Sequence, residues 1–281
     1  MLGKILIIGD VHLGKGASLG KIPAGGIFNT RYLDQINLLN WIIEQVKINN
    51  IETVILTGDI FEDAKPEYSL LNVFIQFLME LSQLGVETHI LAGNHDLKRI
   101  GNIYHSVLDI LEVINIEYIF FHKTVTSFYQ NNISFVLIPF FDRRFLNCSS
   151  HDEAIIKINE KIKKELNALP PETTKIAIGH LALEGSLYVG DEIDDLSNEI
   201  FVPLESFDDF DYVWMGHIHK PQVLKKKPYL AHIGSLDLSN FSESEQNKIL
   251  IVIDSTLENY FYPISIPTRP LKSISIDIPE F

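Results

Sequence analysis

Short apolar runs alternate with segments of helical periodicity over much of the chain. Apolar residues recur at the helical spacing from Leu33 to Val46 and, after Pro66, from Leu70 to Leu81. We expect a helix over each of these segments, and two more over about 104–113 and over 152–166. Strands are expected at 4–8, 53–56, 87–91, 116–121, 125–129, 134–138, 175–178 and 212–215.

The pattern changes after residue 222, where only strands are expected, at 229–233, 249–253, 260–264 and 271–278. An α/β alternation followed by a β-rich end favours one layered α/β domain whose sheet is completed by late strands. We expect this domain to span residues 1–265. The last predicted strand has little after it to pack on, so residues 266–281 are interpreted as the start of a further domain.

Composition excludes several classes of protein. With 281 residues, 46% hydrophobic and 21% charged, the chain is typical of a globular protein rather than a disordered one. Its formal charge of −14 argues against a polybasic nucleic-acid coat or membrane binder. The charge does not exclude an enzyme that acts on nucleic acid, because bound divalent metals can reverse the local field.

The cysteine count and the N-terminal sequence indicate the cellular location of the protein. Cys148 is the single cysteine, which excludes an intrachain disulfide and a multi-cysteine zinc site. No apolar stretch approaches the ~20 residues that a membrane helix needs, and the first apolar run is too short for a signal-peptide core. We therefore expect a soluble, cytoplasmic protein with no membrane partner.

Five short polar motifs follow five of the predicted strands. They are Asp10-Val-His12, Gly58-Asp59, Gly93-Asn94-His95-Asp96, Gly179-His180 and Gly216-His217-Ile-His219. The carboxyl ends of strands in an open α/β sheet converge on one crevice, where ligands bind. Residues two apart in an extended chain point the same way, so Asp10 and His12 can hold one object together.

The motifs supply two carboxylates, four imidazoles and one amide as ligands. This set exceeds what one zinc ion requires, and its mixed oxygen and nitrogen donors suit manganese, iron or zinc. Seven ligands with one shared carboxylate make a two-metal site, and such sites catalyse in-line displacement at phosphorus.

Taken together, the motifs are similar to the motif set of the calcineurin-like metallophosphoesterases. Within that superfamily the chain most resembles the nuclease domain of the SbcD-type DNA-repair nucleases, the Mre-eleven family. The resemblance extends to Gly58-Asp59-Ile60-Phe61, His180-Leu-Ala-Leu-Glu184-Gly185, Phe210-Asp211-Tyr212-Val213, Pro221-Gln222, Gly234-Ser235, Phe241-Ser-Glu243 and Arg269-Pro270-Leu271-Lys272. It implies an α/β fold of four layers, an αββα sandwich of two mixed sheets face to face with helices outside.

The resemblance also implies a role for each motif residue. The first metal would be held by Asp10, His12 and His219, the second by Asn94, His180 and His217, and Asp59 would bridge the two. His95 would not bind metal but would face the scissile phosphate, to position it or to protonate the leaving oxygen. Four imidazoles favour Mn²⁺ over Mg²⁺ for the two divalent ions, since magnesium prefers oxygen ligands.

Two further features are assigned to the site. Glu62 stands where the family often has His or Asp, and we expect its carboxylate to orient His95 from behind. The run Lys225-Lys226-Lys227 occupies a predicted turn beyond His219. It is either a solvated hairpin tip or a set of substrate-binding contacts to phosphate beside the site.

The implied activity is that of a Mn²⁺-dependent DNA nuclease, an exonuclease or endonuclease, in a double-strand-break repair or end-processing complex. A phosphatase or cyclic-nucleotide phosphodiesterase of the same fold is the alternative, although residues 58–65 lack the arginine of the related protein phosphatases. A non-catalytic scaffold is disfavoured, because scaffolds of this type lose ligands and all seven are present here.

The implied partners are DNA, a second copy of the chain and an SbcC-type ATPase subunit. The ATPase would bind through a C-terminal region outside these 281 residues. The homodimer is expected to form through an apolar stripe that serves both core and interface, namely Leu70, Phe74, Phe77 and Leu81 with Val107, Leu108 and Leu111.

Overall fold

Two six-stranded sheets form the centre of the structure, a computed structural model that describes residues 3–101, 103–188, 199–243 and 246–272. The first sheet has the order β14-β13-β1-β2-β3-β6. Its strands are β1 (Lys4–Ile8), β2 (Ile51–Leu56), β3 (Glu87–Leu91), β6 (Ile119–His122), β13 (Ile249–Ile253) and β14 (Phe261–Ser265). The pairs from β1 to β6 are parallel, and β13 and β14 extend the sheet by antiparallel pairing.

The second sheet is also mixed and has the order β11-β12-β10-β9-β8-β7. Its strands are β7 (Thr126–Gln130), β8 (Ile133–Ile138), β9 (Thr174–Gly179), β10 (Tyr212–Met215), β11 (Gln222–Lys226) and β12 (Tyr229–His232). The four inner strands are parallel, and the two outer ones pair antiparallel. A small separate pair, β4 (Lys98–Ile100) with β5 (Ile103–His105), follows the third motif.

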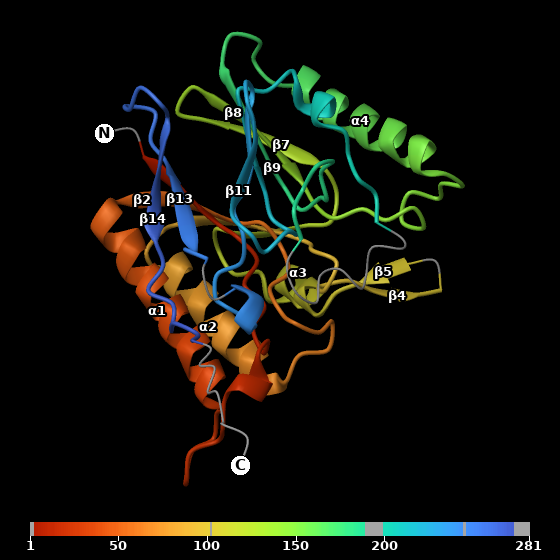
Figure 1. Cartoon of the computed structure of the whole chain (residues 1–281). Coiled ribbons are helices and arrows are strands. Elements are labelled where there is room, and N and C mark those ends of the chain that lie inside the picture. The colour runs from red at the N-terminus through yellow and green to blue at the C-terminus, as the bar shows by residue number, and fades with distance from the viewer. Residues whose placement is uncertain (1–2, 102, 189–198, 244–245, 273–281) are drawn as a thin grey trace, which may run out of the picture.

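Helices cover the outer faces of both sheets. Three of them pack on the first sheet, α1 (Thr30–Asn49), α2 (Tyr68–Gln83) and α3 (Ile110–Ile114). The helix α4 (His151–Asn167) covers the second sheet on the opposite flank (Figure 1). Along β1, Leu6 and Ile8 face the helices while Ile5 and Ile7 face the second sheet. Because both faces are buried, the strand is apolar from Ile5 to Ile8. The expected four-layer αββα sandwich is confirmed.

The expected helix over 104–113 is wrong at its start. Residues 103–105 belong to β5, and the helical turn begins only after Ser106. The Ser106 hydroxyl accepts a hydrogen bond from the Leu108 amide, and the Asp109 carboxylate accepts one from the Ser106 amide. This capping box fixes the helix start at Ser106 and prevents its extension backwards. The strand expected at 271–278 lies almost entirely outside the described residues, and the boundary after residue 265 stays a prediction.

The apolar stripe assigned to the dimer is part of the core. Six of its side chains are at most 4% exposed in the single chain: Leu70, Phe74, Phe77, Leu81, Leu108 and Leu111. They pack between α2, α3 and the first sheet, so they leave no area for a second copy. The assignment of these side chains to an interface is therefore wrong. Among the described residues, none of the helices has the length and apolarity needed to cross a membrane.

A histidine pair of the first sheet, with His89 buried and His122 half-buried, packs against an edge strand of the second sheet. His89 of β3 stacks between Phe120 of β6 and Phe128 of β7. Its Nδ1 lies 2.9 Å from His122 Nε2, and its Nε2 lies 2.8 Å from the Glu87 carboxylate. Burial lowers the pKa of both imidazoles to about 4. The folded protein therefore favours the neutral pair.

This pair predicts a specific loss of stability in acid. The ordinary histidine pKa is 6.5, so the stabilisation is complete above that pH and is lost as the pH falls towards 4. Between pH 7 and pH 5 the free energy of unfolding should fall in both proteins. The fall should be about 2 kcal/mol smaller in His89→Phe than in the wild type, as measured by urea unfolding. His105→Phe, at an exposed histidine, is the control and should follow the wild type. Parallel curves for His89→Phe and the wild type would contradict the assignment.

Candidate metal centre

The five polar motifs meet at one end of the sandwich. The first three follow β1, β2 and β3 of the first sheet, and the last two follow β9 and β10 of the second. Parallel bridges continue the pairing beyond the strands, one joining Asp10 to Ser235 and another joining Leu13 to Phe61. The two sheets therefore deliver their motif loops to a common edge, as the sequence predicts.

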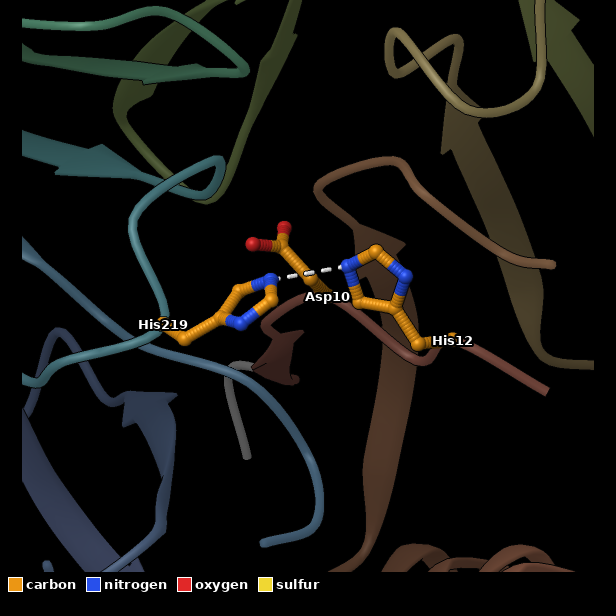
Figure 2. A group of neighbouring side chains, drawn as sticks. All are labelled: Asp10, His12 and His219. Atoms are coloured by element: carbon orange, nitrogen blue, oxygen red, sulfur yellow. Dashed lines mark hydrogen bonds between the residues drawn. The ribbon is translucent and has the colours of Figure 1, made fainter. Parts of the chain in front are cut away.

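One group of ligand atoms comes from Asp10, His12 and His219 (Figure 2). His219 Nε2 lies 2.9 Å from His12 Nε2, so the two ring nitrogens face each other. Asp10 is fully buried, and its Oδ2 has no hydrogen-bond partner among the described residues. A buried carboxylate oxygen without a donor is costly unless a cation meets it, so this group fits a divalent ion.

A second group lies beside the first. His180 Nε2 and His217 Nδ1 each lie 3.0 Å from Asn94 Oδ1 and 3.3 Å from each other. Asp59 Oδ2 lies 3.3 Å from His180 Nε2 and 3.5 Å from His12 Nε2. Asp59 therefore lies between the two groups, where a bridging carboxylate would be.

A hydrogen bond behind His180 and a close charged contact behind His12 set the two ring orientations. His180 Nδ1 lies 3.0 Å from the Thr57 carbonyl, an acceptor that requires a proton on Nδ1 and leaves Nε2 free to bind metal. His12 Nδ1 lies 2.9 Å from the Glu62 carboxylate, which leaves its Nε2 facing His219. Both imidazoles thus turn their Nε2 towards the centre.

A comparable carboxylate supports His217, and the sequence analysis missed it. His217 Nε2 lies 3.2 Å from Glu199 Oε1, and both side chains are about nine-tenths buried. This contact directs Nδ1 towards Asn94 and His180. Glu199 belongs to no motif and lies outside every strand and helix that the sequence predicts, so nothing in the sequence pattern marks it.

The ligand loops hold unusual backbone conformations. His12, Asp59 and His217 have φ values of 47°, 47° and 77°, in the left-handed region that costs side-chain-bearing residues roughly 1–3 kcal/mol. The amides of Val11 and His12 both donate to the Asp59 carbonyl, at 3.0 and 2.8 Å. A Cβ on Gly93 would overlap the Asp59 carboxylate, which explains the glycine there.

Asp96 joins the second and third motif loops. Its carboxylate accepts hydrogen bonds from the Ile60 and Gly93 amides, both at 2.9 Å. Burial, together with the charge of Asp59, raises the pKa of Asp96 to about 7. The sequence places Asp96 in a motif without indicating this role in holding the loops together.

The charges of the centre are balanced by their neighbours. Burial raises the pKa of Asp10 and also acts to raise that of Asp59, but His180 and His95 hold the Asp59 pKa well below its usual range. Burial disfavours the charged His180, yet Asp59 and Asp10 raise its pKa to about 9. A cation bound here would replace such a proton, and metal binding would release it.

Glu62 does not support His95 in the predicted way. Its carboxylate contacts His12 and also lies 3.6 Å from Lys15 Nζ. His95 is held instead by the Glu62 backbone, whose carbonyl accepts from Nδ1 at 2.6 Å. The prediction was wrong because the carbonyl and the side chain of Glu62 point to different histidines. The His95 amide also donates to Asp59 Oδ1, at 2.9 Å.

The lysine run lies away from the centre. β11 runs antiparallel to β12, and Lys226 pairs with Tyr229. Tyr229 pairs with Tyr212 at the start of β10. His217 follows the other end of β10, so the lysines lie one strand length, roughly 13 Å, away from it. Lys225 pairs there with Asp208 at 2.6 Å. The substrate-binding assignment beside the site is therefore wrong for Lys225, Lys226 and Lys227, because the strand carries them away from it.

A buried set of oxygen and nitrogen donors in two groups that share one carboxylate is typical of hydrolases of the two-metal class. Residues 3–221 match the calcineurin-like phosphoesterase family, and the chain belongs to it. Membership of this family makes the protein a metal-dependent phosphoesterase. The chain is 27% identical over 218 residues to the DNA double-strand break repair protein Mre11 of Methanopyrus kandleri. That alignment covers 76% of this chain and 44% of the relative, so this chain matches less than half of the relative's length.

Solved structures support the fold. A dimetal phosphatase from Danio rerio aligns with a TM-score of 0.55 and 11% identity, covering 89% of this chain and 92% of that one. The protein TT1561 of Thermus thermophilus aligns with a TM-score of 0.51 and 12% identity, covering 94% of this chain and 99% of that one. At these identities the similarity establishes the architecture alone.

The supporting carboxylates predict site-selective effects on metal binding. Glu62→Gln should weaken the ion at the His12 group, and Glu199→Gln the ion at the His217 group, each by roughly 10–100-fold. Titration calorimetry with Mn²⁺ measures both affinities. Glu153→Gln, at a carboxylate on α4, is the control and should leave both unchanged. Equal weakening of both ions by either site variant would show that these carboxylates do not act on separate groups.

Proposed function

We propose that the protein is a DNA nuclease that hydrolyses phosphodiester bonds with two Mn²⁺ ions, in double-strand-break repair or DNA-end processing. The observation that carries this proposal is the pair of donor groups sharing Asp59, in a chain similar to the Mre11 of Methanopyrus kandleri. Exonuclease and endonuclease activity are both compatible with such a site.

The seven donors have the chemistry that the proposal needs. Asp10, His12 and His219 would hold one ion, Asn94, His180 and His217 the other, and Asp59 both. Bound divalent ions supply Lewis-acid stabilisation of phosphoryl oxygens and lower the pKa of water. Four imidazoles favour Mn²⁺ over Mg²⁺.

His95 is suited to act on the substrate rather than on a metal. Its Nδ1 donates to the Glu62 carbonyl, which directs the opposite edge of the ring outward from that loop. Its ring lies edge-on to the His12 ring, with centroids 4.9 Å apart, so it borders the first donor group. A histidine held in one orientation beside the ions can position the phosphate or protonate the leaving oxygen.

A phosphomonoesterase or cyclic-nucleotide phosphodiesterase is the competing proposal. The structural similarity to a dimetal phosphatase rests on the fold and not on residues specific to phosphatases. Residues 58–65 contain no arginine that could hold a phosphomonoester. The Mre11 relative supports the nuclease instead.

The resemblance seen in the sequence motifs, together with this relative's role in DNA repair, guides the proposed partners. We propose DNA as substrate, a homodimer, an SbcC-type ATPase subunit as partner, and a cytoplasmic location. If the dimer forms near α2 and α3, it must use exposed side chains such as Tyr68 and Val113, which are 91% and 82% exposed. The formal charge of −14 restricts DNA contacts to the neighbourhood of the ions.

The substrate class is tested by one comparison in Mn²⁺. Single-stranded DNA, long duplex DNA, bis-p-nitrophenyl phosphate and p-nitrophenyl phosphate are offered side by side. We expect cleavage of DNA and of the diester, with single strands and short ends cut faster than long duplex, because an acidic chain has little surface to hold a duplex. A protein that binds two ions and hydrolyses only the monoester would be a phosphatase.

Two substitutions separate metal binding from catalysis. His95→Ala should reduce DNA cleavage by at least roughly 100-fold while both ions stay bound, because it removes only the group facing the phosphate. His217→Ala should lose one ion and the activity together. Calorimetry with Mn²⁺ counts the ions in each variant, and loss of an ion from His95→Ala would refute its assigned role.

A further inference from the structure

A buried lysine lies directly behind the first donor group. Lys248 precedes β13, and its side chain is fully buried. Its Nζ donates to the Glu243 carboxylate at 2.6 Å and to the His219 carbonyl at 2.8 Å. It also contacts Ser235 Oγ at 2.8 Å and Gln246 Oε1 at 2.9 Å. The ammonium group thus donates a hydrogen bond to the backbone carbonyl of His219, whose imidazole is assigned to the metal.

The same lysine reaches the neighbour of a second ligand. Ser235 forms a parallel bridge with Asp10, and the Leu236 amide donates to the Asp10 carbonyl at 2.7 Å. The Ser235 amide donates to the His219 carbonyl, at 3.2 Å. Lys248 therefore ties together the two chain segments that position Asp10 and His219. Both segments serve the first donor group.

The energetics argue that this lysine does more than stabilise the fold. A buried ion pair is often no better for stability than apolar residues of similar volume, because both charges lose their hydration. The Glu243 carboxylate is fully buried and is further held by Asn240 Nδ2 at 3.2 Å and by the Ser239 hydroxyl. A carboxylate fixed in this way holds the ammonium group, and the ammonium group holds the His219 carbonyl.

We propose that Lys248, fixed by Glu243, is a positioning residue for the first metal ion alone. It acts by holding the His219 carbonyl and Ser235, so that His219 Nε2 stays opposite His12 and Asp10. The proposal rests on the donor groups assigned under the proposed function. Its test measures metal binding and not DNA cleavage, so the two can fail separately.

The test compares Mn²⁺ binding by calorimetry in the wild type and in Lys248→Met. We expect two ions per wild-type chain, and at least a tenfold loss of affinity at one site in the variant. Placed in His217→Ala, which retains the first site, Lys248→Met should weaken the remaining ion by the same factor. Placed in His219→Ala, which retains the second site, it should have no effect.

A double variant separates positioning from stability. Lys248→Met with Glu243→Met removes both buried charges and should regain the thermal stability that Lys248→Met loses. The weakened first site should persist in the double variant, because the His219 carbonyl keeps only the Ser235 amide and still lacks the hydrogen bond from Lys248. Recovery of metal affinity together with stability would show a structural role and overturn the proposal. If neither Met variant folds, Ser235→Ala, which removes one lysine contact, should still weaken the first site selectively.

The control is an ion pair at the opposite end of the paired strands β1 and β13. Lys4 Nζ lies 3.2 Å from Asp254 Oδ2, just beyond β13. Lys4→Met should leave both affinities unchanged. Equal weakening of both ions by Lys248→Met, or no weakening, would refute the positioning role. A wild type that binds no Mn²⁺ would instead refute the proposed metal centre.

Discussion

The carboxylate of Asp59 is the group on which both donor sets depend. One oxygen faces His12 and His180, and the other accepts the His95 amide. Holding a carboxylate there requires a left-handed backbone at Asp59 and a neighbour without a Cβ at Gly93. The buried negative charge repels Asp96 and Asp10, whose pKa values rise through burial and through this repulsion. The loops around Asp59 are therefore strained and charged, and only the packed sheets beneath them keep that arrangement in place.

Each of the two sheets carries part of the candidate ligand set. The first sheet supplies Asp10, His12, Asp59 and Asn94, and the second supplies His180, His217 and His219. Each donor group thus combines residues from both sheets. The apolar layer between the sheets, with Ile7, Phe135 and Trp214 fully or nearly fully buried, sets how close the two sets of loops come. Core packing and ligand geometry are coupled for this reason, because a close-packed interior transmits small displacements.

Much of this arrangement could be predicted from sequence, and the failures share a cause. Strands flanked by glycine and polar motifs identified the layered fold and the residues that the structure brings together in the two donor groups, since both depend on local patterns. Glu62 and the lysine run were misassigned because local sequence does not determine where a side chain points or where a strand leads in the fold. The Glu62 carbonyl and carboxylate reach different histidines, and β11 leads away from the centre. Glu199 went unnoticed because a lone acid brought in by tertiary folding leaves no periodic signal.

The partners that orient the ligands explain why motifs alone describe such a centre incompletely. The backbone carbonyls of Thr57 and Glu62 orient His180 and His95. A carbonyl is present whatever residue occupies the position, so its contribution is set by the path of the chain. Side chains play the same part elsewhere, as Glu199 does for His217. The motifs therefore specify which atoms can bind metal, whereas the fold specifies which nitrogen of each ring is free to do so.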